Sequence, residues 1–173
     1  MPRALTTAKA GYIVVLPMNR LRLIFVGELK TSWAVEACRH YQEALSRYVK
    51  CEVSILRDSR DMKDAVARTH REGQALLAAF GPRDRVVGLD ERGASYTSRD
   101  LAAKMGEWRD DPGRAPCLVV GGPYGFSPEA ASRFNERLSL GPLTLPHELA
   151  RVVLLEQLYR AMSILAGHPY HHG

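Results

Sequence analysis

Residues 140–172 read LGPLTLPHELARVVLLEQLYRAMSILAGHPYHH. They join a tight Gly-Pro loop, a long helix expected from about Pro146 to Ala166, and a polar aromatic tail, with Gly167 closing the helix. Just upstream, residues 118–125 read LVVGGPYG, an apolar run that ends in glycines. These two stretches make the end of the chain the place where strand, loop and helix meet.

The rest of the chain alternates apolar runs with helical patterns. Near-continuous apolar runs that end at glycine or turn residues are typical of buried parallel strands, and we expect such strands at 21–27, 51–56, 85–90, 115–122 and 138–140. Between them, apolar residues at spacings of three and four predict helices at 32–48, 61–80, 97–108 and 127–137. This alternation predicts an α/β fold, with a mostly parallel sheet and helices on both of its faces.

Three expected strand ends carry turn residues and lie at one edge of that sheet, at 90–93, 121–123 and 140–142. Open parallel sheets bind ligands at this edge. Neither GxGxxG nor a Walker pattern is present, which disfavours enzymes that bind nucleotide phosphates. Taken alone, GGPYG is also explained as an ordinary strand-to-helix turn, and LGPLTLP as a strand, a turn and a helix start.

Composition indicates one compact domain. The 173 residues are 46% hydrophobic and 25% charged. We assign this domain to residues 18–173 and expect residues 1–17 to be a poorly ordered extension, with a targeting peptide or an added strand as alternatives. The formal net charge is +5, of which Arg3 and Lys9 supply two, so the domain itself is mildly basic. That charge alone is weak evidence for a nucleic-acid partner.

The spacing of the cysteines and histidines indicates the cellular compartment and whether a metal site is present. The three cysteines are widely spaced and form no CxxC pair, so we expect neither disulfides nor a thiolate zinc site, and a cytoplasmic protein. The histidines of the tail flank a proline in poor geometry for zinc, so no metal is expected. No apolar stretch approaches the length of about 20 residues that spans a bilayer, so no membrane partner is expected.

Three blocks near the end of the chain carry a family resemblance: GGPYGFS, then LSLGPLTLPHELARVVLLEQLYRAMSI, then HPYHH. In this order they resemble the SPOUT superfamily of knotted methyltransferases, and within it the RlmH-type large-subunit (23S) rRNA pseudouridine N3-methyltransferases. The resemblance runs from about Met18 to the end of the chain. It implies an α/β-knot fold with a C-terminal trefoil knot, and a homodimer with active sites at the subunit interface.

The resemblance also implies a cofactor and a substrate. The cofactor is S-adenosyl-L-methionine, bound in the knot. The substrate is a pseudouridine of 23S rRNA in the assembled 70S ribosome, in the stem-loop that faces the decoding region. Backbone groups of a tight loop would hydrogen-bond the adenine, and leucine side chains would cover its faces. The matching cofactor positions in this chain are Leu89, Gly121, Leu140, Gly141, Pro142, Leu143, Thr144 and Leu145.

Transfer from an activated methyl donor requires alignment of the acceptor and removal of its proton. The N3 of pseudouridine is an imide nitrogen, which is a poor nucleophile until it is deprotonated. We expect Tyr170 and His171 to reach the acceptor base, from the same chain or from the partner subunit, and Arg160 to stabilise the developing anion. Arg151, His147 and His168 are further candidates. A frayed tail and ordinary solvated arginines are the alternatives.

Two other functions fit the same sequence. One is the same chemistry on another RNA, such as a tRNA. The other is a non-catalytic ribosome- or RNA-binding dimer that keeps the cofactor pocket only as structure.

Overall fold

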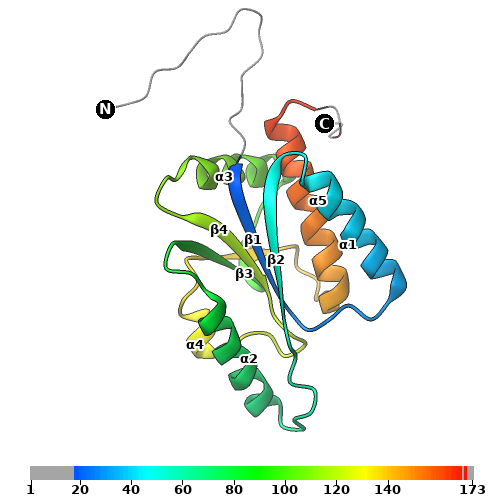
Figure 1. Ribbon diagram of the computed structural model, residues 1–173, viewed down its shortest axis with the longest axis vertical. Coiled ribbons are helices and arrows are strands. Elements are labelled where there is room, and N and C mark those ends of the chain that lie inside the picture. Colours follow the sequence, from blue (N-terminus) through cyan, green and yellow to red (C-terminus); the bar gives the residue numbers. More distant parts are fainter. Residues whose placement is uncertain (1–17, 169, 171–173) are drawn as a thin grey trace, which may run out of the picture.

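The computed structural model describes residues 18–168 and residue 170. It contains five strands and five helices in strict alternation (Figure 1). Their bounds are β1 Met18–Val26, α1 Ser32–Leu45, β2 Val49–Leu56, α2 Ala65–Ala79, β3 Asp84–Ser95, α3 Ser98–Asp110, β4 Ala115–Val120, α4 Pro128–Ala131, β5 Glu136–Ser139 and α5 His147–Leu165.

The strands form one sheet in the order β2-β1-β4-β3-β5, and every pairing is parallel. The expected α/β architecture is therefore confirmed. The predicted trefoil knot stays a prediction. Residues 1–17, for which an extension was expected, lie outside the described residues.

Helices cover both faces of the sheet (Figure 1). On one face, α1, α3 and α5 bury Leu21, Leu23 and Phe25 of β1. On the other, α2 and α4 bury Ile24 and Val26, the alternate residues of the same strand. Successive side chains of a strand point to opposite faces, so a continuous apolar run is needed wherever both faces are covered. Helix α5 packs against both α1 and α3, which makes it the centre of the larger layer.

The start of α1 is held by a side chain that is distant in sequence. Thr31 is the N-cap residue, and its side chain makes no capping hydrogen bond. Instead, the Glu148 carboxylate at the start of α5 accepts hydrogen bonds from the backbone N–H of Lys30 at 2.7 Å and from the Thr31 hydroxyl. A side chain distant in sequence therefore satisfies polar groups of the loop that leads into α1, and it ties the beginnings of α1 and α5 together.

Three helices are shorter than expected, and one of them, α1, ends at Leu45 and not at residue 48. Helix α2 begins at Ala65 rather than near Asp61, because Asp64 caps it by accepting from the Ala67 N–H at 2.6 Å. Helix α4 ends at Ala131 rather than near Arg137. The chain is drawn out of the helix at Asn135, whose N–H donates to the Val86 carbonyl at 2.8 Å and whose side-chain oxygen accepts from the Val86 N–H at 2.8 Å. Pairing with β3 thus replaces the last helical turns.

Strand β3 is longer than expected and irregular. Its register against β5 shifts between Leu89 and Ala94, and both of these residues pair with Leu138. Residues 90–93 therefore bulge out of the ladder at the edge of the sheet where a ligand site was expected.

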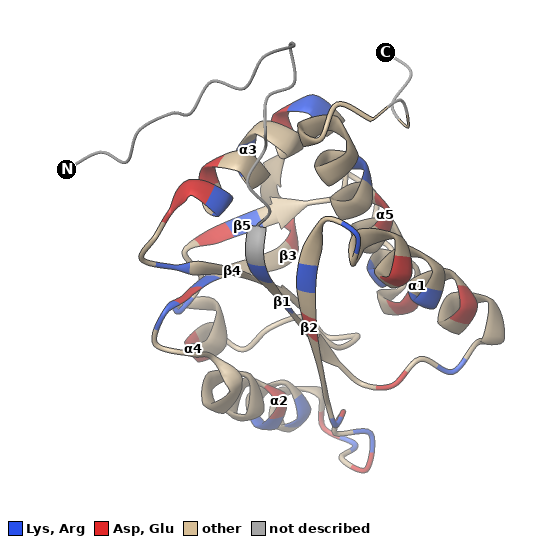
Figure 2. Ribbon diagram, turned by 45° about the horizontal axis from the view of Figure 1, so that its top comes forward, with Lys and Arg blue, Asp and Glu red and all other residues tan. Residues whose placement is uncertain are grey.

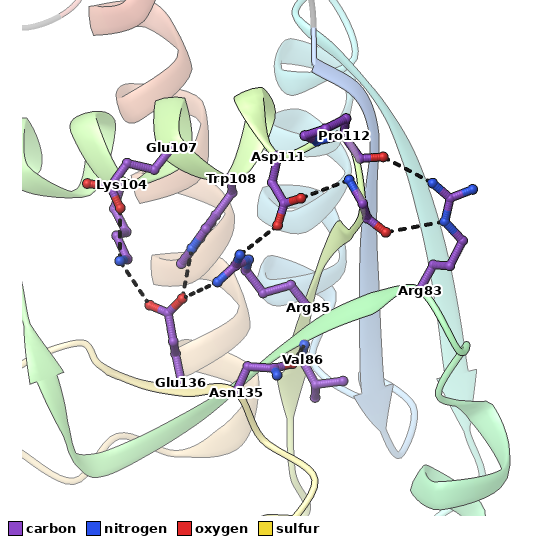
Figure 3. Close-up of polar contacts among 11 residues, drawn as sticks. Arg83, Arg85, Val86, Lys104, Glu107, Trp108, Asp111, Pro112, Asn135 and Glu136 are labelled. Atoms are coloured by element: carbon purple, nitrogen blue, oxygen red, sulfur yellow. Dashed lines mark hydrogen bonds and ion pairs between the residues drawn. The ribbon is translucent and has the colours of Figure 1, made fainter.

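A network of charged side chains fixes β5 beside β3 and α3 (Figure 3). The Glu136 carboxylate accepts hydrogen bonds from Arg85 and from the Trp108 indole, each at 3.1 Å, and pairs with Lys104 at 3.4 Å. Arg85 also donates to Asp111 at 2.7 Å. Glu136 is thus the shared acceptor for donors from a strand and a helix.

Candidate active site

A cavity of about 560 Å³ opens at the carboxyl ends of β3, β4 and β5. Its walls are the bulge after Leu89, the glycine turn after β4, the loop after β5 and the first turn of α5. The volume lies within the range of about 300 to 1,000 Å³ that is usual for small-molecule sites. The cavity therefore occupies the edge at which parallel sheets bind ligands.

Seven of the eight positions expected to hold the cofactor line this cavity, and Pro142 is the one that does not. The seven come from three separate loops, so the fold brings together residues that are up to 56 positions apart in the chain. The lining positions are Leu89, Gly121, Leu140, Gly141, Leu143, Thr144 and Leu145.

The loop after β5 is held at both ends. At one end the Ser139 hydroxyl donates to the Gly141 carbonyl at 2.8 Å, and at the other the Thr144 hydroxyl donates to Glu91 of the β3 bulge at 2.9 Å. Gly141 has a φ of +130°, a conformation that strains any residue with a Cβ. Between these anchors the side chain of Leu143 is 75% exposed. The loop thus offers backbone groups and an uncovered apolar side chain to a ligand.

Gly121 closes the opposite wall. A Cβ at this position would lie 3.0 Å from the Gly125 carbonyl oxygen and 3.1 Å from the Phe126 ring. Glycine is therefore needed for the turn itself.

The cavity carries charged groups that were not singled out in the sequence. Arg137 is paired with Asp90 at 2.9 Å. Arg92 also lines the cavity, and no carboxylate of the described chain lies within ion-pair distance of it. For Asp90 and Arg92 the sequence signal was their place after an expected strand end, and the bulge that carries them depends on pairing of β3 with β5. Arg137 lies on β5 itself, in a segment for which a helix end was expected.

His147 lines the cavity from the first turn of α5. Its Nε2 atom is buried and has no hydrogen-bond partner among the described residues. Burial, followed by the nearby Arg151 charge, lowers the pKa of His147 below its ordinary value. At neutral pH the ring is therefore a neutral side chain at the cavity wall.

Arg151 is a buried residue rather than a solvated charge, with 1% of its surface exposed. Its guanidinium donates to the Val26 carbonyl at 2.5 Å and lies over the Phe25 ring, 5.0 Å from the centroid. Burial is the main cause that lowers its pKa. Arg151 thus joins α5 to the end of β1 from inside the core.

Two of the expected catalytic residues, Arg160 and Tyr170, do not line this cavity. Arg160 follows His147 by thirteen residues on α5, a distance of about 20 Å along the helix axis. There it pairs with Glu156 at 2.5 Å and lies over the Tyr170 ring, 4.9 Å from its centroid. His171 lies outside the described residues. Within one chain, the structure therefore does not bring Arg160 and Tyr170 together with the predicted cofactor positions.

The surroundings of Tyr170 determine its protonation. Its ring packs edge-on against Tyr159 at a centroid distance of 4.6 Å, and its hydroxyl donates to Glu156 at 3.4 Å. Burial raises the pKa of Tyr170 to about 12. Tyr170 is consequently a neutral phenol near pH 7, able to donate a hydrogen bond but unsuited to remove a proton.

Residues 18–168 and 170 provide neither a metal site nor a membrane span. No group of three or more histidine, cysteine or acidic side chains there is placed to hold a metal ion. In the same part of the chain, no helix has the length and apolar character needed to cross a membrane.

Known proteins similar to this chain identify its family. A protein family described as "Predicted SPOUT methyltransferase" matches residues 19–171. Among relatives named "Ribosomal RNA large subunit methyltransferase H", that of Solidesulfovibrio magneticus is 52% identical over 90% of this chain and 100% of its own length. Those of Maridesulfovibrio salexigens and an Anaeromyxobacter species are 43% and 44% identical, over 90% and 88% of this chain and 99% of their own lengths. The chain therefore belongs to the SPOUT methyltransferase family.

Proposed function

We propose that this protein transfers a methyl group from S-adenosyl-L-methionine to N3 of a pseudouridine in 23S rRNA of the assembled ribosome. The main support for a methyl-donor site is the cavity at the ends of β3, β4 and β5, which is lined by seven of the eight expected cofactor positions. The rRNA target is supported by the names of relatives that are up to 52% identical and matched over their whole length.

The cavity suits the proposed cofactor. The backbone between Leu140 and Leu145 would hydrogen-bond the adenine, and Leu89, Leu143 and Leu145 would cover its faces. The exposed Leu143 side chain is an apolar group that such a ligand would bury. S-adenosyl-L-methionine supplies an already activated methyl group, so the protein's own task is to align the acceptor and manage its proton.

We infer that the catalytic side chains act across a homodimer. Arg160 lies ten residues, or about 15 Å, along α5 from Ala150, a lining residue of the cavity of its own chain, so Arg160 and the adjacent Tyr170 would serve the cavity of the partner subunit. In this arrangement Tyr170, with its pKa raised to about 12, donates a hydrogen bond to the acceptor base. Arg160 stabilises the negative charge that develops as N3 loses its proton, and His171 is our candidate to receive that proton.

Labelled methyl transfer to ribosomal particles from cells that lack this protein tests the function. Assembled 70S ribosomes, free 50S subunits, naked rRNA and tRNA are compared, and the modified base is identified by mass spectrometry. We expect label at N3 of one pseudouridine on 70S particles. Label on tRNA instead would assign the chemistry to another RNA, and cofactor binding without transfer to any RNA would support a binding protein.

A further inference from the structure

We propose that Tyr124 and Arg68 form a stacking platform for an RNA base at the mouth of the cavity. This inference rests on the proposed function, because it assigns part of the RNA-binding surface to residues outside the cofactor and catalytic sets. The platform joins a residue of the glycine turn after β4 to a residue of α2, 56 positions earlier in the chain.

The turn that carries Tyr124 is firmly seated. It is closed by a hydrogen bond from the Gly125 N–H to the Gly122 carbonyl at 3.0 Å, with Gly125 at a φ of +75°. The turn packs closely against α2, because a Cβ on Gly122 would lie only 2.6 Å from the carboxylate of Glu72 on that helix. Glu72 is itself buried and accepts from the Ser59 N–H at 2.9 Å. The turn therefore holds Tyr124 at a fixed place on the rim.

Tyr124 is exposed to solvent, whereas most of the apolar residues that line the cavity are not. Its side chain is 54% exposed, whereas Val120 and Leu138 at the inner wall are buried. Leu143 is the other large apolar lining residue that is exposed, and it already has a place in the proposed adenine site. The tyrosine lies at the outer side of the cavity, where an acceptor nucleotide must approach a cofactor bound deeper inside.

The guanidinium group of Arg68 lies over the Tyr124 ring. Its guanidinium carbon lies 4.9 Å from the ring centroid, and no carboxylate of the described chain lies within ion-pair distance of it. Neighbouring arginines differ, since Arg71 pairs with Asp61 at 3.1 Å and Arg137 with Asp90 at 2.9 Å. The charge of Arg68 thus remains available for an RNA phosphate.

An aromatic face together with an unpaired arginine is the combination that binds unstacked RNA bases. Arg92 adds a second unpaired cation on the bulge after Leu89, which also lines the cavity. Figure 2 shows that basic and acidic residues are interspersed along the helices and loops of the described chain. A local platform accounts for RNA contact on such a surface without a large net charge.

The test uses the full-length protein with 70S ribosomes from cells that lack it. Tyr124→Leu removes the ring, Tyr124→Phe keeps it, Arg68→Gln removes the cation, and Arg71→Gln is the matched control on the same helix. Methyl transfer gives KM for ribosomes, and equilibrium titration gives Kd for S-adenosyl-L-methionine. Thermal melts confirm that each variant is folded.

We expect Tyr124→Leu to raise KM for ribosomes about tenfold, with Kd for the cofactor changed less than twofold, because the variant loses the ring on which one base stacks. Tyr124→Phe should restore most of the lost affinity. Arg68→Gln should weaken ribosome binding and reduce its salt dependence by about one counterion, and Arg71→Gln should not.

Three results would overturn the platform: an unchanged KM for ribosomes in Tyr124→Leu, an equal loss of cofactor affinity, or a loss of dimer mass in that variant. The last two would place Tyr124 on the cofactor or on a second copy of the chain. If the wild-type protein methylates no RNA, the proposed function fails by itself. Co-sedimentation with the same ribosomes then still separates Tyr124→Leu from Tyr124→Phe.

Discussion

His147 shows how burial changes a single titrating group at the cavity wall. Its pKa is lowered in the folded protein, so the folded state binds a proton more weakly than the unfolded chain does. Stability should therefore fall as pH drops below the unfolded value of about 6.5. We expect the Tm of His147→Gln, measured from pH 8 to pH 5, to fall less steeply than that of the wild type. Parallel curves would show that His147 does not carry this dependence.

Two glycines predict opposite responses to alanine. A Cβ on Gly88 would lie 2.2 Å from the Phe134 ring, which is itself held edge-on against Phe126 at 4.7 Å. Gly88→Ala should lower the free energy of unfolding by about 1 to 3 kcal/mol through overpacking. On Gly106, inside α3, the same atom would meet only Leu165 at 3.5 Å.

Gly106→Ala should instead raise stability by about 0.5 to 1 kcal/mol, since alanine is the better helix former. Urea denaturation of both variants measures the difference. Equal effects at the two positions would contradict the packing described here.

At the scale of elements, Glu136 is expected to hold β5 in place (Figure 3). Its side chain is 22% exposed and accepts from Arg85, Lys104 and Trp108. Removing a shared acceptor leaves partly buried donors without partners, which costs about 1 to 3 kcal/mol. We expect Glu136→Ala to lower the free energy of unfolding by that amount in chemical denaturation.

Glu107→Ala is the control for this network. Glu107 also pairs with Lys104, at 3.0 Å, but its side chain is 65% exposed. Exposed pairs contribute little, so the change should stay within about 0.5 kcal/mol. A similar loss in both variants would mean that Glu136 stabilises no more than a surface charge does.

At the scale of the whole molecule, mixed dimers test whether Arg160 and Tyr170 of one subunit complete the cavity of the other. Leu143→Asp should abolish cofactor binding without unfolding the chain, because the side chain is 75% exposed. Tyr170→Ala should abolish transfer and leave cofactor binding intact. After subunit exchange, random pairing should restore about a quarter of the wild-type rate, from one complete site in each mixed dimer.

The measurement is methyl transfer by the two variants before and after they are unfolded and refolded together. Each variant refolded alone is the control. No recovery in mixtures whose dimeric mass has been verified would mean that each chain completes its own site.

Much of the fold was accessible from local patterns. Continuous apolar runs predicted all five strands, because a strand covered on both faces, such as β1, buries successive side chains. Helical spacing predicted the long helices, because a helix such as α5 buries side chains at intervals of three and four. The sequence did not predict helix ends that depend on contacts with distant residues. Helix α4 ends early because Asn135 pairs with β3, and no feature of the sequence near Ala131 signals this.

The sequence by itself determined the alternation of strands and helices, the three loops at one edge of the sheet and the family blocks near the end of the chain. Each of these depends on residues close together in sequence. Tertiary structure alone decided that Arg151 is buried, that residues 90–93 bulge into the cavity, that Arg68 meets Tyr124, and that Arg160 lies far from the cofactor positions. These features depend on contacts between distant parts of the chain, which periodicity and motif spacing do not encode.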